Sequence, residues 1–351
     1  MSITQAVTGV AIVVLLGVMV TLHSGDDRTA FGGDDARSKT DTVKTLRLLA
    51  LGDVNLGRRL GQKLLKGDTM YPWQYVKDTL AAYDVVFANL ESNLSDQHGR
   101  TEDPGSNTIF TGPPMGAASL RRGGITVVSI ANNHALDFGL TALRQTHTLL
   151  TEAGVAFAGT GDSLGEARRP VILNVRGMRV ALFACSALMN EGKRSNWRRW
   201  VADTSTAELL PLIKATRDSV DVLVVSVHGG IEYGSAPDPA LLAWARRIIE
   251  AGADIVLGHH PHVPYAIEYW KGGVIAPSLG NFVFKQPFQP WTQRSFALEV
   301  VCSRAASGVR SFSARCIPIS VDYQPRFLEQ GPEYNAIIQR VSNASSLHAH
   351  D

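Results

Sequence analysis

The 351-residue chain lacks the features that would place it in several large classes of protein. Three cysteines are too few for a scaffold held together by disulfides. A formal net charge of +2, without a basic stripe interleaved with aromatic residues, provides no electrostatic basis for binding nucleic acid. What remains is an ordinary globular composition, 45% hydrophobic and 19% charged, in a chain long enough to bury a substantial core.

The few cysteines leave one question open. Cys185 falls in an apolar run and is expected to be a small core residue. Cys302 and Cys316 lie on two late β-like segments. They could form a disulfide in an oxidising compartment or remain two free thiols, because sequence alone does not place their Cα atoms.

One long hydrophobic run stands at the N-terminus. Residues 3–22 contain no charged side chain, and a helix of twenty residues spans about 30 Å, the thickness of a bilayer core. No Lys or Arg precedes the run and residues 19–23 make a poor cleavage site. Residues 1–24 are therefore predicted to be an uncleaved membrane anchor in preference to a signal sequence. Arg28 and Arg37 follow the span, which weakly favours a cytoplasmic domain.

Polar segments mark the boundaries of the folded domain. Residues 25–44 are rich in Gly, Asp, Ser and Thr and are predicted to be a flexible linker. The domain is expected over residues 45–325, with a C-terminal tail over 326–351. Within the domain, the Gly/Pro/Asp-rich stretch 95–114 is predicted to be a long mobile loop over a site.

Apolar runs of strand length alternate with segments of helical spacing along the domain. This alternation predicts an α/β protein with a mostly parallel or mixed sheet and helices on its faces. Residues 171–175 and 178–185 are predicted to form a hairpin that turns at residues 176–177. The other early strands are expected over residues 46–51, 84–88, 125–130, 221–227 and 254–257.

Five predicted strands share one feature: a polar residue able to bind a metal follows directly after the apolar run. Each such residue has an ordinary alternative, such as a helix cap, a turn former or a solvated loop residue. These alternatives are poor jointly, because sites in open α/β sheets lie beyond the carboxyl ends of the strands. A shared metal site is therefore predicted. The residues are Asp53, Glu91, Asn133 with His134, His228, and His260 with His262.

Three histidines surround Pro261 at the last of these strand ends. A residue before proline favours extended conformations, so His260 is expected to be extended. His260 and His262 would then project to one side and serve as ligands. His259 is expected to face away from the site as a bystander.

The mixture of ligand types indicates the chemistry. Carboxylates, imidazoles and an amide oxygen suit Mn, Fe or Zn better than Mg or Ca. Two such ions need a bridging ligand, which Glu91 or Asp53 could supply. A pair of ions generates hydroxide at neutral pH and clamps an in-line displacement at phosphorus. His134 is the candidate general acid.

Five motifs occur in a characteristic order: Gly-Asp-Val-Asn-Leu-Gly-Arg at 52–58, Asn-Leu-Glu-Ser at 89–92, Ala-Asn-Asn-His-Ala-Leu-Asp at 131–137, His-Pro-His at 260–262 and Ser-Leu-Gly-Asn-Phe at 278–282. With them the chain resembles the CapA family, which is associated with poly-γ-glutamate capsule synthesis and export. The resemblance implies a fold similar to calcineurin-like metallophosphoesterases, a four-layer α/β/β/α sandwich. It also implies an extracytoplasmic domain.

The resemblance assigns roles to individual residues. It implies one ion held by Asp53, Glu91 and His262, and a second held by Glu91, Asn133, His228 and His260, with His134 as general acid. Two departures from the family pattern occur. Asn55 stands where many phosphoesterases have a histidine, so the number of ions stays open, and Gly229 replaces a tryptophan of the pocket wall. The candidates for contacting substrate are Arg58, Asn55, Glu232 and Tyr233.

Two functions are consistent with these features. The first is a membrane-anchored CapA-type protein that works with polyglutamate synthase or export components on an acidic polymer. The second is a metal-dependent phosphoesterase. In both cases the partners include the membrane and exclude nucleic acid.

Overall fold

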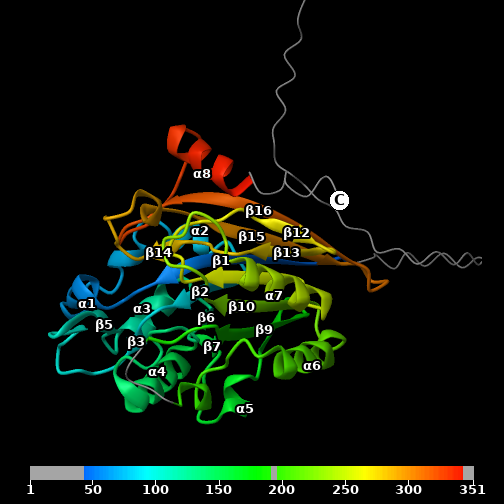
Figure 1. Cartoon of the computed structure of the whole chain (residues 1–351). Helices are drawn as coiled ribbons and strands as arrows, with labels where there is room; N and C mark the ends of the chain where they lie inside the picture. Colours follow the sequence, from blue (N-terminus) through cyan, green and yellow to red (C-terminus); the bar gives the residue numbers. More distant parts are fainter. Residues whose placement is uncertain (1–42, 191–195, 343–351) are drawn as a thin grey trace, which may run out of the picture.

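The computed structural model describes residues 43–190 and 196–342, in which two β-sheets pack face to face between helices (Figure 1). The larger sheet has eight strands in the order β17-β16-β15-β1-β2-β6-β7, with β14 paired to β1. These strands are β1 (Lys44–Val54), β2 (Val85–Leu90), β6 (Val127–Ser129), β7 (Ala156–Ala158), β14 (Asn281–Val283), β15 (Arg294–Arg304), β16 (Arg310–Ser320) and β17 (Arg326–Phe327).

The smaller sheet has six strands in the order β12-β13-β11-β10-β9-β8. They are β8 (Val171–Val175), β9 (Met178–Ser186), β10 (Val222–His228), β11 (Ile255–His259), β12 (Glu268–Trp270) and β13 (Gly273–Ala276). The α-helices are α1 (Arg58–Leu65), α2 (Lys77–Leu80), α3 (Gly116–Gly123), α4 (Gly139–Ala153), α5 (Leu164–Ala167), α6 (Thr206–Arg217), α7 (Pro239–Glu250) and α8 (Pro332–Ser342). Three short 3₁₀ helices span Tyr71–Trp73, Trp197–Arg199 and Pro290–Gln293.

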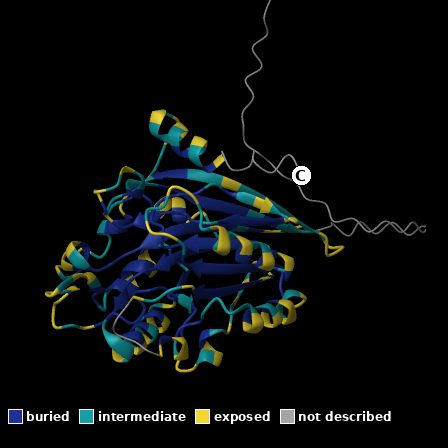
Figure 2. Ribbon diagram, viewed as in Figure 1, coloured by how far each residue is buried: buried dark blue, intermediate teal, exposed yellow. Residues whose placement is uncertain are grey.

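Alternate side chains of β10 point into two different hydrophobic cores, one on each face of the smaller sheet. Val222 and Val224 belong to the core shared with the larger sheet. Leu223 and Val225 lie in a second core, which α6 and α7 close from outside. Both faces of the smaller sheet are thus buried, as Figure 2 shows for the central strands. The predicted α/β/β/α sandwich is confirmed, and the strands read as continuous apolar runs because neither face meets water.

Parallel pairing brings the predicted strand ends together. β2 pairs in parallel with β1 and with β6 in the larger sheet, and β10 pairs in parallel with β11 in the smaller one. The carboxyl ends of parallel neighbours lie at the same edge of a sheet. The two sheets therefore present their functional loops at one rim of the sandwich.

The predicted hairpin is confirmed. β8 and β9 pair antiparallel with Val175 opposite Met178, which leaves Arg176 and Gly177 as a two-residue turn. Both turn residues have positive φ, at 50° and 71°. A two-residue hairpin of this kind matches the twist of the strands, and glycine accepts the left-handed conformation at no steric cost.

The prediction that residues 95–114 form a long loop is wrong. This stretch contains β4 (Glu102–Asp103) and β5 (Ser106–Gly112), which with β3 (Asn93–Leu94) form a three-stranded sheet. Thr111 pairs with Asn93, and Phe110 is buried. The composition resembles a loop because only the last three residues of β5 are buried.

The two late cysteines do not form a disulfide. Cys302 on β15 lies opposite Phe312, whereas Cys316 on β16 lies opposite Leu298. All three cysteines are free thiols. The antiparallel register separates the pair by four residues along the strands, so the alternative of two unlinked thiols holds.

The ends of the chain lie largely outside the described residues. The predicted anchor (1–24), nearly all of the linker and residues 343–351 are in the parts that are not described. Across residues 43–190 and 196–342, none of the helices has the length and apolar character to cross a bilayer. The described part of the predicted C-terminal tail includes α8, whose Ile337 and Val341 are buried in the main core.

Candidate metal centre

The candidate site lies between the two sheets, where five strands end. Asp53 is the penultimate residue of β1, and Glu91 directly follows β2. His228 is the last residue of β10, and His260 directly follows β11. Asn133, His134 and His262 lie at the same rim, so the structure brings all of the predicted ligand residues together. Each of these side chains is at least nine-tenths buried.

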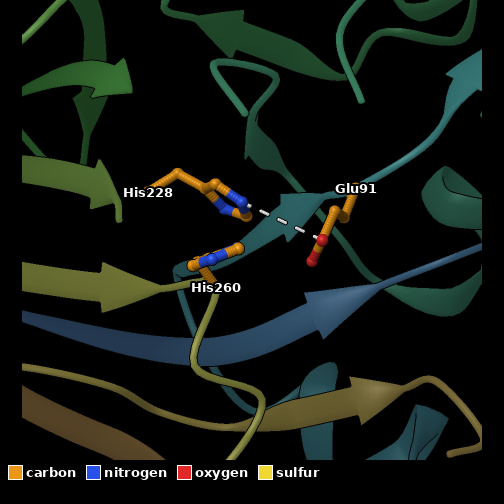
Figure 3. Close-up of side chains that lie close together, drawn as sticks. All are labelled: Glu91, His228 and His260. Carbon is orange, nitrogen blue, oxygen red and sulfur yellow. Dashed lines mark ion pairs between the residues drawn. The ribbon is translucent and has the colours of Figure 1, made fainter. Parts of the chain in front are cut away.

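Glu91 is the centre of the site. Its carboxylate is fully buried, and neither oxygen has a hydrogen-bond partner among the described residues. Oε1 lies 3.9 Å from Nε2 of His228, as drawn in Figure 3, and 3.6 Å from Nε2 of His262. A buried carboxylate without partners costs several kcal/mol or more in free energy. A divalent cation bound to this carboxylate would remove that cost, so the donor set fits a metal ion.

Two groups of ligand atoms share Glu91. Asp53, Glu91 and His262 form one, and Glu91, His228 and His260 form the other; within each, the ligand atoms lie within 4.8 Å of one another. In the second group, Nδ1 of His260 is also buried and has no hydrogen-bond partner within residues 43–190 and 196–342. Asn133 lies beside this group, with Oδ1 2.7 Å from Nε2 of His228.

The protonation states suit a cation. Burial, reinforced by the nearby His260, holds the pKa of His228 well below its ordinary value. Burial and the neighbouring His262 lower the pKa of His260 to about 4. Both imidazoles are therefore neutral at pH 7, as metal ligands must be. Burial, with the charge of Asp53, raises the pKa of Glu91 well above its usual range, so without metal this carboxyl is protonated more readily than an exposed one.

Asp53 stays ionised because its neighbours donate to it. Burial by itself would raise its pKa, but hydrogen bonds and charge from His259 and His262 hold that pKa well below the usual range. Nδ2 of Asn89 donates to Oδ1 at 2.8 Å. Nδ1 of His262 lies 3.1 Å from Oδ2. The site thus contains one fixed anion, Asp53, and one titrating anion, Glu91.

The prediction that His259 faces away is wrong. Its ring is fully buried, with Nδ1 3.2 Å from Oδ1 of Asp53. Side chains alternate along β11, and Ile255 and Leu257 face the larger sheet. His259 has the same parity and therefore points at Asp53 from across the sandwich. It helps to hold the carboxylate of Asp53 in place.

The expectation of an extended His260 is also wrong. Its φ is 97°, and that of His262 is 59°. For residues other than glycine, such conformations cost of order 1–3 kcal/mol each and collect at functional sites. Arg58 and Tyr233 at the same rim share the positive sign, with φ of 52° and 58°. The preference imposed by Pro261 is overridden where the chain must turn both imidazoles into the site.

His134 is oriented by a carboxylate. Its Nδ1 lies 2.8 Å from Oδ2 of Asp137, which is three residues further on. Nε2 faces the site, 3.7 Å from Oε1 of Glu91. Phe110 packs against the imidazole with ring centroids 4.2 Å apart. This geometry holds the ring with its free nitrogen toward the metal-binding groups.

The four predicted substrate contacts lie in different places. The Arg58 guanidinium lies over Phe110, 4.5 Å from the ring centre, and the His134 ring packs against the same residue. Glu232 is half exposed at the rim, 3.7 Å from Nε2 of His262, and the Tyr233 ring lies 5.8 Å from that of His262. Oδ1 of Asn55 accepts the backbone N–H of Gly57 at 2.7 Å, so this amide oxygen is used within its own turn.

Position 229, where the family has a tryptophan, has no room for a larger side chain. A Cβ added to Gly229 would lie 2.7 Å from Cβ of Ala187. A larger side chain at this position would need Ala187 to move. The departure from the family pattern is thus matched by packing in this chain.

Several residues of the site were not singled out in advance. Asn89 bridges Asp53 and His228, with Nδ2 3.2 Å from Nδ1 of His228. Asn281 lies 2.9 Å from Nδ1 of His262. Asn89, Asp137 and Asn281 all stand inside the motifs quoted above, which was the available signal. Asn190, which accepts from Asn133, carried no such signal.

The fold and the site together define a class. An α/β/β/α sandwich with a buried His, Asp and Glu cluster at its strand ends is an α/β protein with a candidate site for divalent ions. Residues 47–286 match the model of the family described as bacterial capsule synthesis protein PGA_cap. The chain belongs to this family, and the predicted CapA-type membership is confirmed.

Two curated relatives illustrate the match. The chain is 30% identical over 254 residues to the capsule biosynthesis protein CapA of Bacillus anthracis, covering 71% of this chain and 61% of that protein. It is 30% identical over 266 residues to the PGA biosynthesis protein CapA of Bacillus subtilis, covering 73% of this chain and 68% of that protein. The chain thus spans less than two thirds of the length of the first of these proteins.

Among solved structures, a putative 5′-nucleotidase from Staphylococcus aureus in complex with alpha-ketoglutarate is similar, with a TM-score of 0.46 and 13% identity. The superposition covers 84% of this chain and 57% of that chain. A likeness of this degree carries no argument about activity.

Proposed function

We propose that this protein acts in the synthesis or export of a capsule-type acidic polymer, poly-γ-glutamate or a chemical relative of it, and that a two-ion metal site is required for this role. The observation that carries the proposal is the carboxylate of Glu91, buried without a partner and common to two groups of ligands. The names of the two CapA relatives supply the polymer.

The metal site of the proposal uses the residues in two sets. Asp53, Glu91 and His262 would hold one ion. The second would be held by Glu91, Asn133, His228 and His260. Imidazole and carboxylate ligands favour Mn, Fe or Zn. When bound, two such ions supply a hydroxide nucleophile at neutral pH and neutralise charge on a phosphoryl group.

A second candidate function, metal-dependent hydrolysis of a phosphoester, is favoured by His134. Asp137 holds Nδ1 of this imidazole and leaves Nε2 facing Glu91. A histidine so held can protonate a leaving oxygen, and the carboxylate stabilises the charged ring. Arg58, whose guanidinium lies 4.5 Å from the ring centre of Phe110, provides a cation for an anionic substrate. These residues would bind the phosphoester and transfer the proton.

Hydrolysis is tested with the purified protein, Mn²⁺ and a panel of aryl phosphodiesters and phosphomonoesters. His134→Ala is expected to lower kcat by about 10²–10⁴-fold, the contribution of a general acid, with metal content unchanged. His147→Ala is the matched control, because His147 lies on α4 and contacts Thr160, outside the site. Metal-loaded wild-type protein that turns over nothing on the panel would rule out the phosphoesterase candidate.

The role in polymer synthesis is tested by complementation. The gene is placed in a bacterial strain that makes poly-γ-glutamate and has lost its own relative. Wild-type protein is expected to restore the polymer, and Glu91→Gln is not, because the bridging charge is gone. Equal restoration by both would show that the polymer role does not use the metal site.

Membrane attachment is part of the proposal. Residues 1–24 would anchor the chain and leave the domain outside the cell, where it meets synthase or export components of the polymer. Protease added to intact cells is then expected to remove the domain, and alkaline carbonate is expected to leave the anchored chain in the membrane fraction. A domain that is protected in intact cells and digested after lysis would contradict this topology.

A further inference from the structure

Asn281 is a buried amide beside the first group of ligands. It is fully buried at the start of β14, and its Cα pairs in register with that of Asp53 on the neighbouring parallel strand β1. Side chains of register partners leave a sheet on the same side. Oδ1 of Asn281 accordingly lies 2.9 Å from Nδ1 of His262, which is itself 3.1 Å from Oδ2 of Asp53.

The orientation of this amide is determined by its other end. Nδ2 donates to Oε1 of Gln286 at 2.8 Å and to the backbone carbonyl of Thr292 at 3.1 Å. A carbonyl oxygen only accepts, so the nitrogen must lie on that side. The amide oxygen therefore points at His262.

One ring nitrogen meets two accepting oxygens here, and the backbone N–H of His260 also reaches Oδ2 of Asp53, at 3.4 Å. Nδ1 of His262 carries at most one proton, yet it faces two oxygens that accept, one from Asp53 and one from Asn281. One donor would have to be divided between them. A cation in the middle would be bound by all three lone pairs instead.

The contact with Asp53 falls within the separation expected of two ligands of one ion, and the contact with Asn281 lies just below it. Two atoms bound at about 2.0–2.2 Å from a metal and roughly 90–110° apart are separated by about 3.0–3.5 Å. The contacts of His262 with Asp53 and Asn281 are 3.1 Å and 2.9 Å. An asparagine oxygen also meets an imidazole nitrogen in the second group, where Oδ1 of Asn133 lies at hydrogen-bond distance, 2.7 Å, from Nε2 of His228.

The first ion needs such a ligand. Asp53, Glu91 and His262 are three donors, and the oxygen of Asn55 accepts the backbone N–H of Gly57. We propose that the side-chain oxygen of Asn281 is the fourth protein ligand of this ion. Each ion is then held by the shared Glu91, by imidazole and by one asparagine oxygen. The inference rests on the metal site of the proposed function.

Metal counting tests this assignment without any substrate. Full-length protein is stripped with chelator, titrated with Mn²⁺ by calorimetry and analysed for bound metal after equilibrium dialysis. Wild type is expected to bind two ions. Asn281→Ala is expected to lower the affinity for one ion more than about tenfold and to leave the affinity for the other unchanged. About tenfold is the lower bound for loss of an outer-shell partner. Asn281→Asp, which keeps an oxygen in place, is expected to retain both.

Asn133→Ala is the matched variant for the other ion. It should weaken one ion, and Asn281→Ala combined with Asn133→Ala should weaken both, because the two amides act on different ions. If Asn281→Ala binds two ions with affinities within about twofold of wild type, the assignment is overturned; ordinary scatter between independent sites is about this size.

A spectroscopic arm separates a ligand from a mere hydrogen-bond acceptor. In protein loaded with ¹¹³Cd²⁺ and labelled with ¹⁵N-histidine, His262 is expected to lose its Nδ1 proton and to show coupling from Nδ1 to cadmium. If the Nδ1–H of His262 persists at full metal occupancy, Asn281 is only a hydrogen-bond acceptor for that proton, and the proposal is overturned. Two bound ions with no phosphoester hydrolysis would refute only the enzymatic candidate.

Discussion

Replacing Glu91 with glutamine is expected to abolish tight binding of both metal ions at once. Glutamine keeps the size and shape of the side chain, so the fold is retained. It removes the negative charge that both groups of ligands share. It also brings an amide toward Nε2 of His228 and of His262, which are 3.9 Å and 3.6 Å from the carboxylate oxygen.

Loss of an outer-shell partner typically costs about 10–100-fold in metal affinity, and loss of a shared ligand should exceed that at each position. The measurement is metal content after dialysis together with a calorimetric titration. Glu208→Gln is the matched control, since its side chain is 60% exposed on α6 and belongs to neither group. It should change affinity only slightly. Retention of two tightly bound ions by Glu91→Gln would refute the shared-ligand arrangement.

The same variant should change the pH dependence of stability. Burial and the charge of Asp53 raise the pKa of Glu91 in the folded, metal-free protein above its ordinary value of 4.5. Its stabilising contribution is therefore complete below pH 4.5 and is lost as the pH rises through the folded-state pKa. Asp53 acts in the opposite sense, since its pKa is lowered and its contribution is lost as the pH falls.

Denaturant unfolding in the presence of chelator checks this sign. Metal-free wild type should lose free energy of unfolding as the pH rises above 4.5, whereas Glu91→Gln should lose less over the same interval. Identical slopes would mean that Glu91 does not hold a proton in the metal-free fold.

Gly52→Ala is expected to have the largest effect on stability. A Cβ at this position would lie 1.9 Å from the carbonyl oxygen of Gly280 and 2.8 Å from its carbon. The obstacle is backbone, so no change of rotamer relieves it. The neighbouring Asp53 N–H donates to that carbonyl at 3.0 Å, which ties the glycine to the site. β1 and β14 approach this closely only because position 52 has no side chain.

The expected loss in free energy of unfolding is at or above about 3 kcal/mol, the upper end of the range for overpacked cores. Weaker metal binding should accompany it, since Asp53 and Asn281 would be pushed apart. Gly165→Ala in α5 is the control, because its nearest neighbour would be Oγ of Ser163 at 4.0 Å. That variant should be neutral or slightly stabilising. Wild-type stability in Gly52→Ala would show that the strands can separate at little cost.

The residues by themselves determined much of this protein. Period and composition predicted the strands and the Arg176–Gly177 hairpin, because both depend on neighbours in the chain. A ligand-type residue after each of five apolar runs indicated a common site, because parallel strands end at one rim. The motifs around Asp53 and Glu91 indicated the family, which residues 47–286 confirm.

Only the tertiary structure decided what meets across the two sheets. The sequence predicted that His259 faces away from the site. Its direction follows from the alternation of side chains along β11, which can be used only once it is known which face of the strand packs on the larger sheet. It predicted an extended His260, whereas packing imposes a φ of 97°. The contact of Asn281 with His262 and the unpartnered carboxylate of Glu91 depend on which strands are neighbours. The contact of His259 with Asp53 joins residues 206 positions apart, and no local rule specifies it.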